Sequence, residues 1–183
     1  MQGFRNLLLI APASILIIGV GLFAGPPKIE EVLSKFANYR EWTRVNAHPA
    51  IMDPTAAIRC SYQPGNSIPV PGSDPHKEHF VTVYVNETGK RAMMEEGFSR
   101  FPEGSVIVKE KLSEELFTKG TPELLTVMIK QKKGFNPKVG DWEFLAVSGD
   151  AKSVIQRGKL ETCQSCHVTQ AKQDYIYGTY KQN

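Results

Sequence analysis

Two thiols and an imidazole lie together near the C-terminal end of the chain. The stretch ETCQSCHVTQ contains Cys163, Cys166 and His167 in the pattern C-x-x-C-H, and the whole chain has only three cysteines and four histidines. Thiols at this spacing can each form a thioether to a vinyl group of a porphyrin, and the adjacent histidine can ligate the iron. The pattern therefore predicts one covalently attached c-type haem, with His167 as the metal ligand.

Three other uses of the same residues remain open. A structural zinc site normally needs four nitrogen or sulfur ligands, and the third cysteine, Cys60, is isolated. A thioredoxin-like redox pair normally starts a helix ahead of a βαβ unit, and few residues follow His167 for that purpose. A disulfide between Cys163 and Cys166 would leave His167 without a role. Haem attachment accounts for all three side chains.

The thiols need a helix to bring them onto one face. If the segment after Thr162 is helical, Cys163 and Cys166 lie one turn apart on the same side. Thr162 suits an N-cap, and no residue from Cys163 to Lys172 breaks a helix. We therefore expect a haem-binding helix that begins directly after Thr162.

Composition favours a globular domain behind an export segment. The chain has 183 residues, 41% of them hydrophobic, and a net charge of +3 that is too small and dispersed to indicate nucleic-acid binding. Arg5 precedes an uncharged apolar run over residues 7–24, so residues 1–25 are predicted to be a signal peptide or an N-terminal membrane anchor. Residues 26–183 would then form one haem domain in the periplasm or on the periplasmic face of the inner membrane. Cys60 is expected to be buried.

The pattern of apolar residues predicts an α+β fold. Residues 29–39 and 88–96 have helical periodicity, and residues 47–74 are broken by prolines and turn residues. Four runs rich in β-branched and aromatic residues read as strands, at residues 79–85, 105–112, 123–131 and 142–147. We expect a mainly antiparallel sheet with flanking helices and a C-terminal haem-binding helix, which differs from the helical architecture of ordinary small cytochromes c.

Several of these segments together resemble one family. NYREW (38–42), TVYVNETG (82–89), FPEGSVIVKE (101–110), GDWEF (140–144) and CQSCH followed by KQDYIY (172–177) are similar, in this order, to the cytochrome P-460 family. The resemblance covers residues 39–177. It implies a mainly antiparallel sheet like that of cytochrome c′-β, often in a homodimer, and a five-coordinate haem with an open distal side.

The resemblance also implies roles for two strand residues. Lys109, in the V-K-E motif, matches the lysine that hydroxylamine-oxidising members cross-link to the porphyrin. Thr126 matches their distal carboxylate. A threonine hydroxyl can hydrogen-bond a ligand but does not accept a proton near neutral pH as glutamate does. Two functions follow as hypotheses: oxidation of hydroxylamine, or nitric-oxide binding and electron transfer without net chemistry.

Strand alternation gives a more general reading of the same positions. Ile107, Lys109 and Lys111 should share one face of their strand, and Thr126 should share a face with Met128. Met128 could be a sixth iron ligand, as in electron carriers, or a core residue.

Other residues bear on partners. The basic turn at residues 130–134 could dock an acidic redox partner or be a solvated hairpin tip. Loop or surface positions are expected for His48, His76 and His79, although a distal histidine ligand is an open alternative.

Overall fold

The computed structural model describes residues 28–51, 79–96, 100–113 and 120–178. The predicted export segment, Cys60, His76 and most of the proline-rich segment lie outside the described residues. Predictions about them stay untested.

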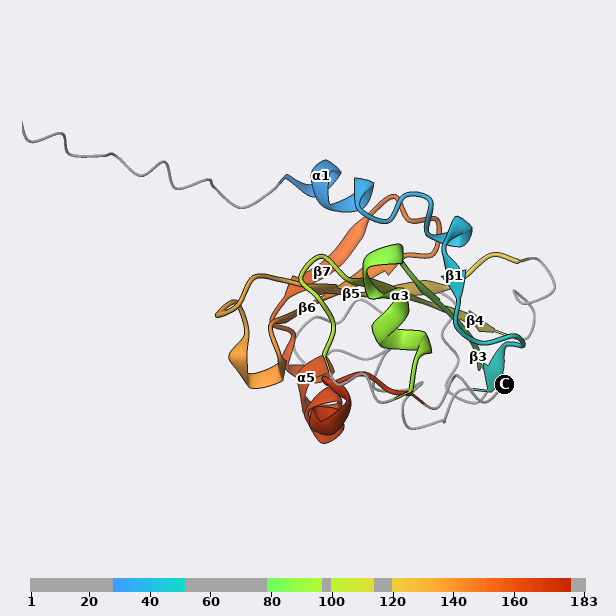
Figure 1. Cartoon of the computed structure of the whole chain (residues 1–183). Helices are drawn as coiled ribbons and strands as arrows, with labels where there is room; N and C mark the ends of the chain where they lie inside the picture. The colour runs from blue at the N-terminus through green and yellow to red at the C-terminus, as the bar shows by residue number, and fades with distance from the viewer. Residues whose placement is uncertain (1–27, 52–78, 97–99, 114–119, 179–183) are drawn as a thin grey trace, which may run out of the picture.

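The described chain is built on one antiparallel sheet of seven strands (Figure 1). Its order is β1-β3-β4-β5-β6-β7, and the short β2 also pairs with β3. The strands are β1 Thr43–Arg44, β2 Ala50–Ile51, β3 His79–Val85, β4 Val106–Ser113, β5 Leu124–Lys130, β6 Trp142–Ser148 and β7 Val154–Gly158. The sheet confirms the predicted fold class, and the four predicted strands are β3 to β6. The short strands β1 and β2 and the edge strand β7 were not predicted.

Within the described ranges, three α-helices and three 3-10 helices flank the sheet. They are α1 Ile29–Ser34, α3 Glu87–Met94, α5 Glu161–His167, η1 Tyr39–Glu41, η2 Pro137–Val139 and η3 Val168–Gln173. Helix α3 begins where the Asn86 side chain accepts a hydrogen bond from Gly89 N at 3.0 Å. The prediction for the first helix was too long, because the chain tightens into η1 after α1.

The predicted start of the haem-binding helix was wrong. Helix α5 begins at Glu161, and Leu160 is its N-cap, so Thr162 is already inside the first turn. The helix is also shorter than expected. It tightens into η3 after His167, and Gln170 leaves helical geometry with φ −100° and ψ 25°.

Side-chain alternation gives the sheet two buried faces. Helix α1 covers one face, where Val32 and Phe36 pack on Val108 and other strand residues. The opposite face, which we call the α5 face, includes Ile107 and packs against α3 and the C-terminal segment. Figure 1 shows α1 and α5 on opposite sides of the sheet. The alternation predicted for β4 is therefore correct.

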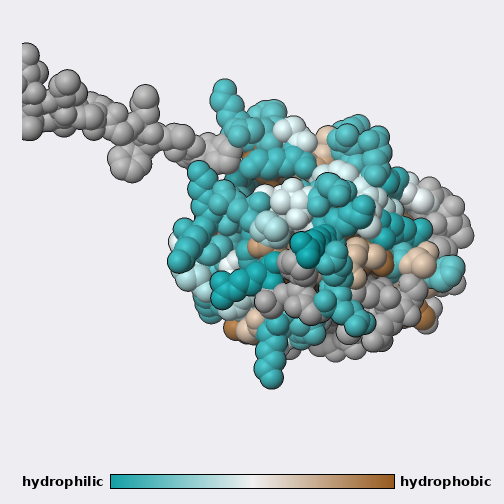
Figure 2. Space-filling model, viewed as in Figure 1, coloured by the Kyte–Doolittle hydropathy of each residue, from teal (hydrophilic) through white to brown (hydrophobic). Residues whose placement is uncertain are grey.

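The surface gives no sign of a large apolar patch on the side seen in Figure 2, which is mostly hydrophilic. The exposed large apolar residues lie on different elements: Ile29, Ile51, Met94, Ile155 and Val168. Within the described ranges, no helix combines the length and the apolar character needed to cross a membrane.

Candidate functional site

Helix α5 holds both thiols against the α5 face. Cys163 and Cys166 are half-buried and are not joined in a disulfide. Cys163 packs against the core of this face. The Cys166 carbonyl accepts hydrogen bonds from Thr169 Oγ1 at 2.7 Å and from the Tyr177 hydroxyl at 3.2 Å. These bonds hold the end of α5, so the thiols and the histidine keep a fixed relation.

His167 has one ring nitrogen committed to the protein. Its Nδ1 lies 2.7 Å from the carbonyl oxygen of Tyr175, and a carbonyl can only accept, so Nδ1 must carry the proton. The lone pair is then on Nε2. Most iron-ligating histidines are oriented in this way, by a bond from the other ring nitrogen. The ring packs at 5.3 Å from the rings of both Phe144 and Tyr177.

The surroundings of His167 keep its imidazole neutral. The pKa of His167 is lowered to about 4: burial is the main cause, the nearby Lys109 ammonium acts in the same direction, and the hydrogen bond with Tyr175 partly opposes them. A neutral imidazole is the form that ligates a metal. The effect of Lys109 also shows that its charge lies near His167.

Two adjacent rows of residues cross the sheet beneath α5. The strand register aligns Ile107, Met128 and Phe144 in one row and Lys109, Thr126, Ala146 and Gln156 in the next. The first row is buried, and all four residues of the second are half-exposed. The structure thus brings Lys109 and Thr126 together as direct cross-strand partners.

This arrangement fits a haem. The His167 ring packs on Phe144, which belongs to the buried row. The half-exposed row lies next to the buried row on the sheet. The donor set, two thiols one turn apart and an imidazole with its Nε2 lone pair available, is that of a c-type attachment site.

Met128 belongs to the packed core. It is 8% exposed and lies directly across from Phe144, in the row under His167. The position of Met128 therefore favours the core alternative over iron ligation.

A buried polar cluster at the far end of the same strands was missed. His79 Nε2 and Lys111 Nζ lie 3.4 Å and 3.8 Å from Glu123 Oε2, and all three side chains are at most 3% exposed. The expectation of a loop or surface position was wrong for His79, which is the first residue of β3; His48 is exposed as expected. His79 directly precedes the apolar residues of β3, and the sequence alone does not show that the strand and its burial begin at this histidine.

Sequence reasoning also missed the support of the Tyr175 carbonyl. Asp174 and Tyr175 both have positive φ, 50° and 67°, and no glycine marks this turn.

The basic turn at residues 130–134 is only partly a solvated hairpin tip, which was one interpretation of it. Lys130 Nζ donates a hydrogen bond to Asp174 at 2.6 Å. Lys132 and Lys133 do lie exposed in that tip.

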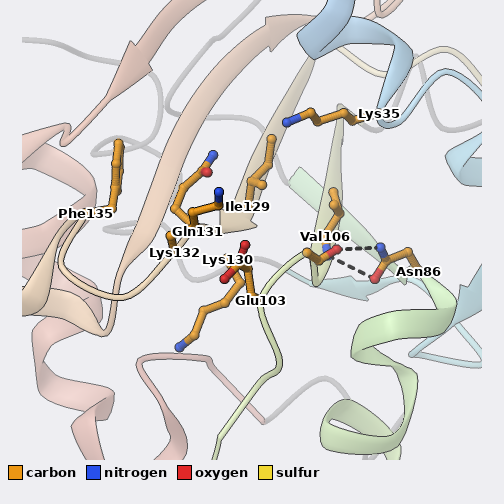
Figure 3. A pocket seen from close by; sticks show the side chains of 10 residues that line it. Lys35, Asn86, Glu103, Val106, Ile129, Lys130, Gln131, Lys132 and Phe135 are labelled. Carbon is orange, nitrogen blue, oxygen red and sulfur yellow. Dashed lines mark hydrogen bonds between the residues drawn. The ribbon is translucent and has the colours of Figure 1, made fainter. Parts of the chain in front are cut away.

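A pocket of about 540 Å³ lies elsewhere, at the ends of β4 and β5 (Figure 3). Val106 and Ile129, from the α1 side of the sheet, line it together with Lys35 and Lys132. Figure 3 shows Asn86 hydrogen-bonded to Val106 at its edge. None of the C-x-x-C-H side chains lines this pocket.

Within the part of the chain that the structure describes, no group of three His, Cys, Asp or Glu side chains is arranged to hold a metal ion. The zinc alternative thus gains no support there.

Comparison with known proteins identifies a family. The family model for cytochrome P460 matches residues 37–178, and no curated protein matches the chain. The matched range covers most of the chain, including every strand and helix α5. The chain therefore belongs to the cytochrome P460 family, and it is a c-type haem protein with a single covalently attached haem.

Proposed function

We propose that this protein is an exported mono-haem cytochrome that binds a small uncharged nitrogen species, such as nitric oxide or hydroxylamine, at an open iron position. Cys163 and Cys166 would hold the haem through two thioethers, and His167 would ligate its iron through Nε2. The observation that carries this proposal is the 2.7 Å bond from His167 Nδ1 to the Tyr175 carbonyl, because it leaves the Nε2 lone pair for the iron. Haem supplies an iron that changes oxidation state and takes a ligand at its open position.

The half-exposed row supplies the residues that meet the bound group and its ligand. Thr126 can donate a hydrogen bond from its hydroxyl to a ligand, and Lys109 lies directly across the strand pair from it. Lys109 also places a positive charge near His167, as the pKa of the imidazole shows. In this proposal Thr126 orients the ligand, while Lys109 contacts the porphyrin.

The open iron position is supported by the packing of Met128. Met128 is buried in the core next to Phe144, so its side chain is committed to packing and would not serve as an iron ligand. A protein with no strong sixth ligand binds gases and small amines rather than only passing electrons. Ligand binding coupled to electron transfer is therefore the function that this site supports best.

Hydroxylamine oxidation is a second candidate. It needs a group that accepts protons, and the Thr126 hydroxyl does not do so near neutral pH. One observation favours it nevertheless: Glu123 is a buried carboxylate near Lys111, which lies two residues along β4 from Lys109. In this role Glu123 would accept protons from the substrate.

Optical titration of the purified protein tests these proposals. We expect a high-spin reduced spectrum that changes on addition of nitric oxide, and no turnover with hydroxylamine and an electron acceptor. A Thr126→Val variant, which keeps the shape but removes the hydroxyl, should release the ligand faster. Sustained acceptor reduction by hydroxylamine, abolished in Glu123→Gln, would select the oxidase instead. A low-spin spectrum insensitive to nitric oxide would contradict both.

Export and partners complete the proposal. Members of this family are typically exported, and residues 1–25 are proposed to direct this chain to the periplasm or to tether it to the inner membrane. Electrons would pass to a soluble or membrane redox partner, and we propose a homodimer as the assembly. Cell fractionation tests the location: recovery of mature protein in the cytoplasm would contradict it.

A further inference from the structure

We infer that Asp174 is a positioning residue for the axial histidine: it fixes the Tyr175 carbonyl and so sets the strength of the iron–histidine bond. This inference rests on the proposed function, in which His167 ligates the iron. Asp174 acts on His167 through the backbone, because the next residue, Tyr175, supplies the carbonyl that accepts the hydrogen bond from His167 Nδ1.

The first step is the turn that presents the carbonyl. After η3, Asp174 and Tyr175 adopt left-handed backbone conformations with φ 50° and 67°. Such conformations cost roughly 1–2 kcal/mol for each non-glycine residue, so surrounding contacts must hold them. The turn directs the Tyr175 carbonyl back to His167 Nδ1 at 2.7 Å.

The second step is the set of contacts that holds the turn. Asp174 Oδ2 accepts hydrogen bonds from Phe101 N at 2.7 Å and from Lys130 Nζ at 2.6 Å. Its main-chain carbonyl accepts from Trp142 Nε1 at 2.8 Å. Asp174 is only 6% exposed, and a carboxylate buried to this extent needs charged and hydrogen-bonding partners. The carboxylate and the main-chain carbonyl of Asp174 therefore tie the turn to the sheet.

The third step is the rigidity of the partners. Lys130 and Trp142 are cross-strand neighbours on β5 and β6, and Lys130 Nζ lies 4.9 Å from the centre of the Trp142 ring. Phe101 packs edge-on against the same indole at 5.4 Å. Trp142 is completely buried. Two side chains of the sheet, and the backbone N–H of a residue packed on one of them, thus converge on Asp174.

The chemical consequence follows from the hydrogen bond to Nδ1. A well-aligned acceptor makes the imidazole a stronger donor to iron through Nε2, and loss of such outer contacts typically lowers metal affinity by about 10- to 100-fold. If Asp174 loses its partners, the Tyr175 carbonyl can rotate away and the iron–histidine bond weakens. The thioethers would still retain the haem.

The test uses the full-length haem-loaded protein with two variants. Asp174→Asn keeps the shape and an acceptor for Phe101 N but removes the charge that faces Lys130. Trp142→Phe removes the indole donor and keeps an aromatic ring. Lys138→Gln is the matched control, because Lys138 forms an exposed pair with Glu161 at 3.4 Å beside α5 and lies outside the Asp174 contacts.

The readouts are the iron–histidine stretching frequency of the reduced protein and the rate at which nitric oxide displaces the histidine. We expect a lower frequency and roughly 10-fold faster displacement in Asp174→Asn and Trp142→Phe, with unchanged haem content and no change in Lys138→Gln. If Asp174→Asn does not fold, Trp142→Phe decides by the same criteria.

Two results separate the possible failures. Variants that hold haem and keep the frequency and displacement rate within about twofold of the parent would overturn the role of Asp174 and leave the proposed function intact. Absence of an iron–histidine stretch in the parent protein would overturn the assignment of His167 itself, and with it the proposed function.

Discussion

Gly140 lies against the turn that presents the Tyr175 carbonyl, and its replacement by alanine measures how closely that turn is packed. A Cβ atom at Gly140 would lie 2.7 Å from Tyr175 Cδ2 and 2.8 Å from Asp174 Oδ1. Gly140 also has a φ of 64°. Gly140→Ala should therefore both strain its own backbone and displace the Asp174–Tyr175 turn.

A second glycine separates these two effects. Gly120 has almost the same φ, 65°, but no atom of the described residues lies within 4 Å of a Cβ built there. Gly120→Ala should cost about 1–2 kcal/mol in the free energy of unfolding, for the left-handed conformation alone. Gly140→Ala should cost the same amount of unfolding free energy and about 1–3 kcal/mol more, because the added methyl group crowds the packed neighbours.

Urea unfolding of the haem-loaded variants, followed by far-ultraviolet circular dichroism, measures both costs. The reduced optical spectrum shows whether the iron environment changes, which we expect for Gly140→Ala only. If the two variants lose the same stability to within about 0.5 kcal/mol and neither spectrum shifts, the turn is not closely packed and the reasoning fails.

Further predictions concern the face of the sheet opposite α5 and the division between the two faces. Tyr39→Phe removes the 2.6 Å bond from the hydroxyl to the buried Glu110 carboxylate, and urea unfolding should show a loss of about 1–3 kcal/mol. Burial, then Glu110, raises the pKa of Tyr39 above its ordinary value of 10.0, so folding favours the neutral phenol. This stabilisation is complete below pH 10 and declines above it, by up to about 1.4 kcal/mol per pH unit. Tyr39→Phe should lack this pH-dependent component. Equal slopes of the free energy of unfolding against pH in parent and variant would contradict the assignment. Leu145→Ala, at a position 1% exposed on the α1 side, should cost about 2–5 kcal/mol without altering the haem spectrum. Phe144 is adjacent to Leu145 in sequence but faces the other side of the sheet, so Phe144→Leu should alter the iron–histidine frequency. A haem effect of Leu145→Ala together with none of Phe144→Leu would refute the assignment of faces.

The central strands could be predicted because each contains a run of apolar and β-branched residues bounded by turn residues. Most residues of β4 and β5 are buried, on both faces of the sheet, and the alternation correctly separates Ile107 from Val108. β7 could not be found in this way. It is a half-buried edge strand of five residues, paired across an irregularity between Ala146 and Val147, and its sequence VIQRG has no apolar period.

The C-x-x-C-H motif located α5 but not its support. Spacing alone places Cys163 and His167 on one short helix, whereas the N-cap depends on where the preceding chain turns, which Thr162 does not reveal. The left-handed turn at Asp174 and Tyr175 carries no glycine, so nothing local announces it. It exists because partners from β5 and β6 hold it, and such contacts between distant segments are not visible in a single sequence.

The most direct test of the account is mass spectrometry of the peptide spanning residues 160–172 from exported protein. We predict that this peptide carries the mass of one haem, with both Cys163 and Cys166 consumed and unavailable to alkylation. Recovery of the unmodified peptide with two alkylated thiols, from protein that has been exported and folded, would contradict the central claim.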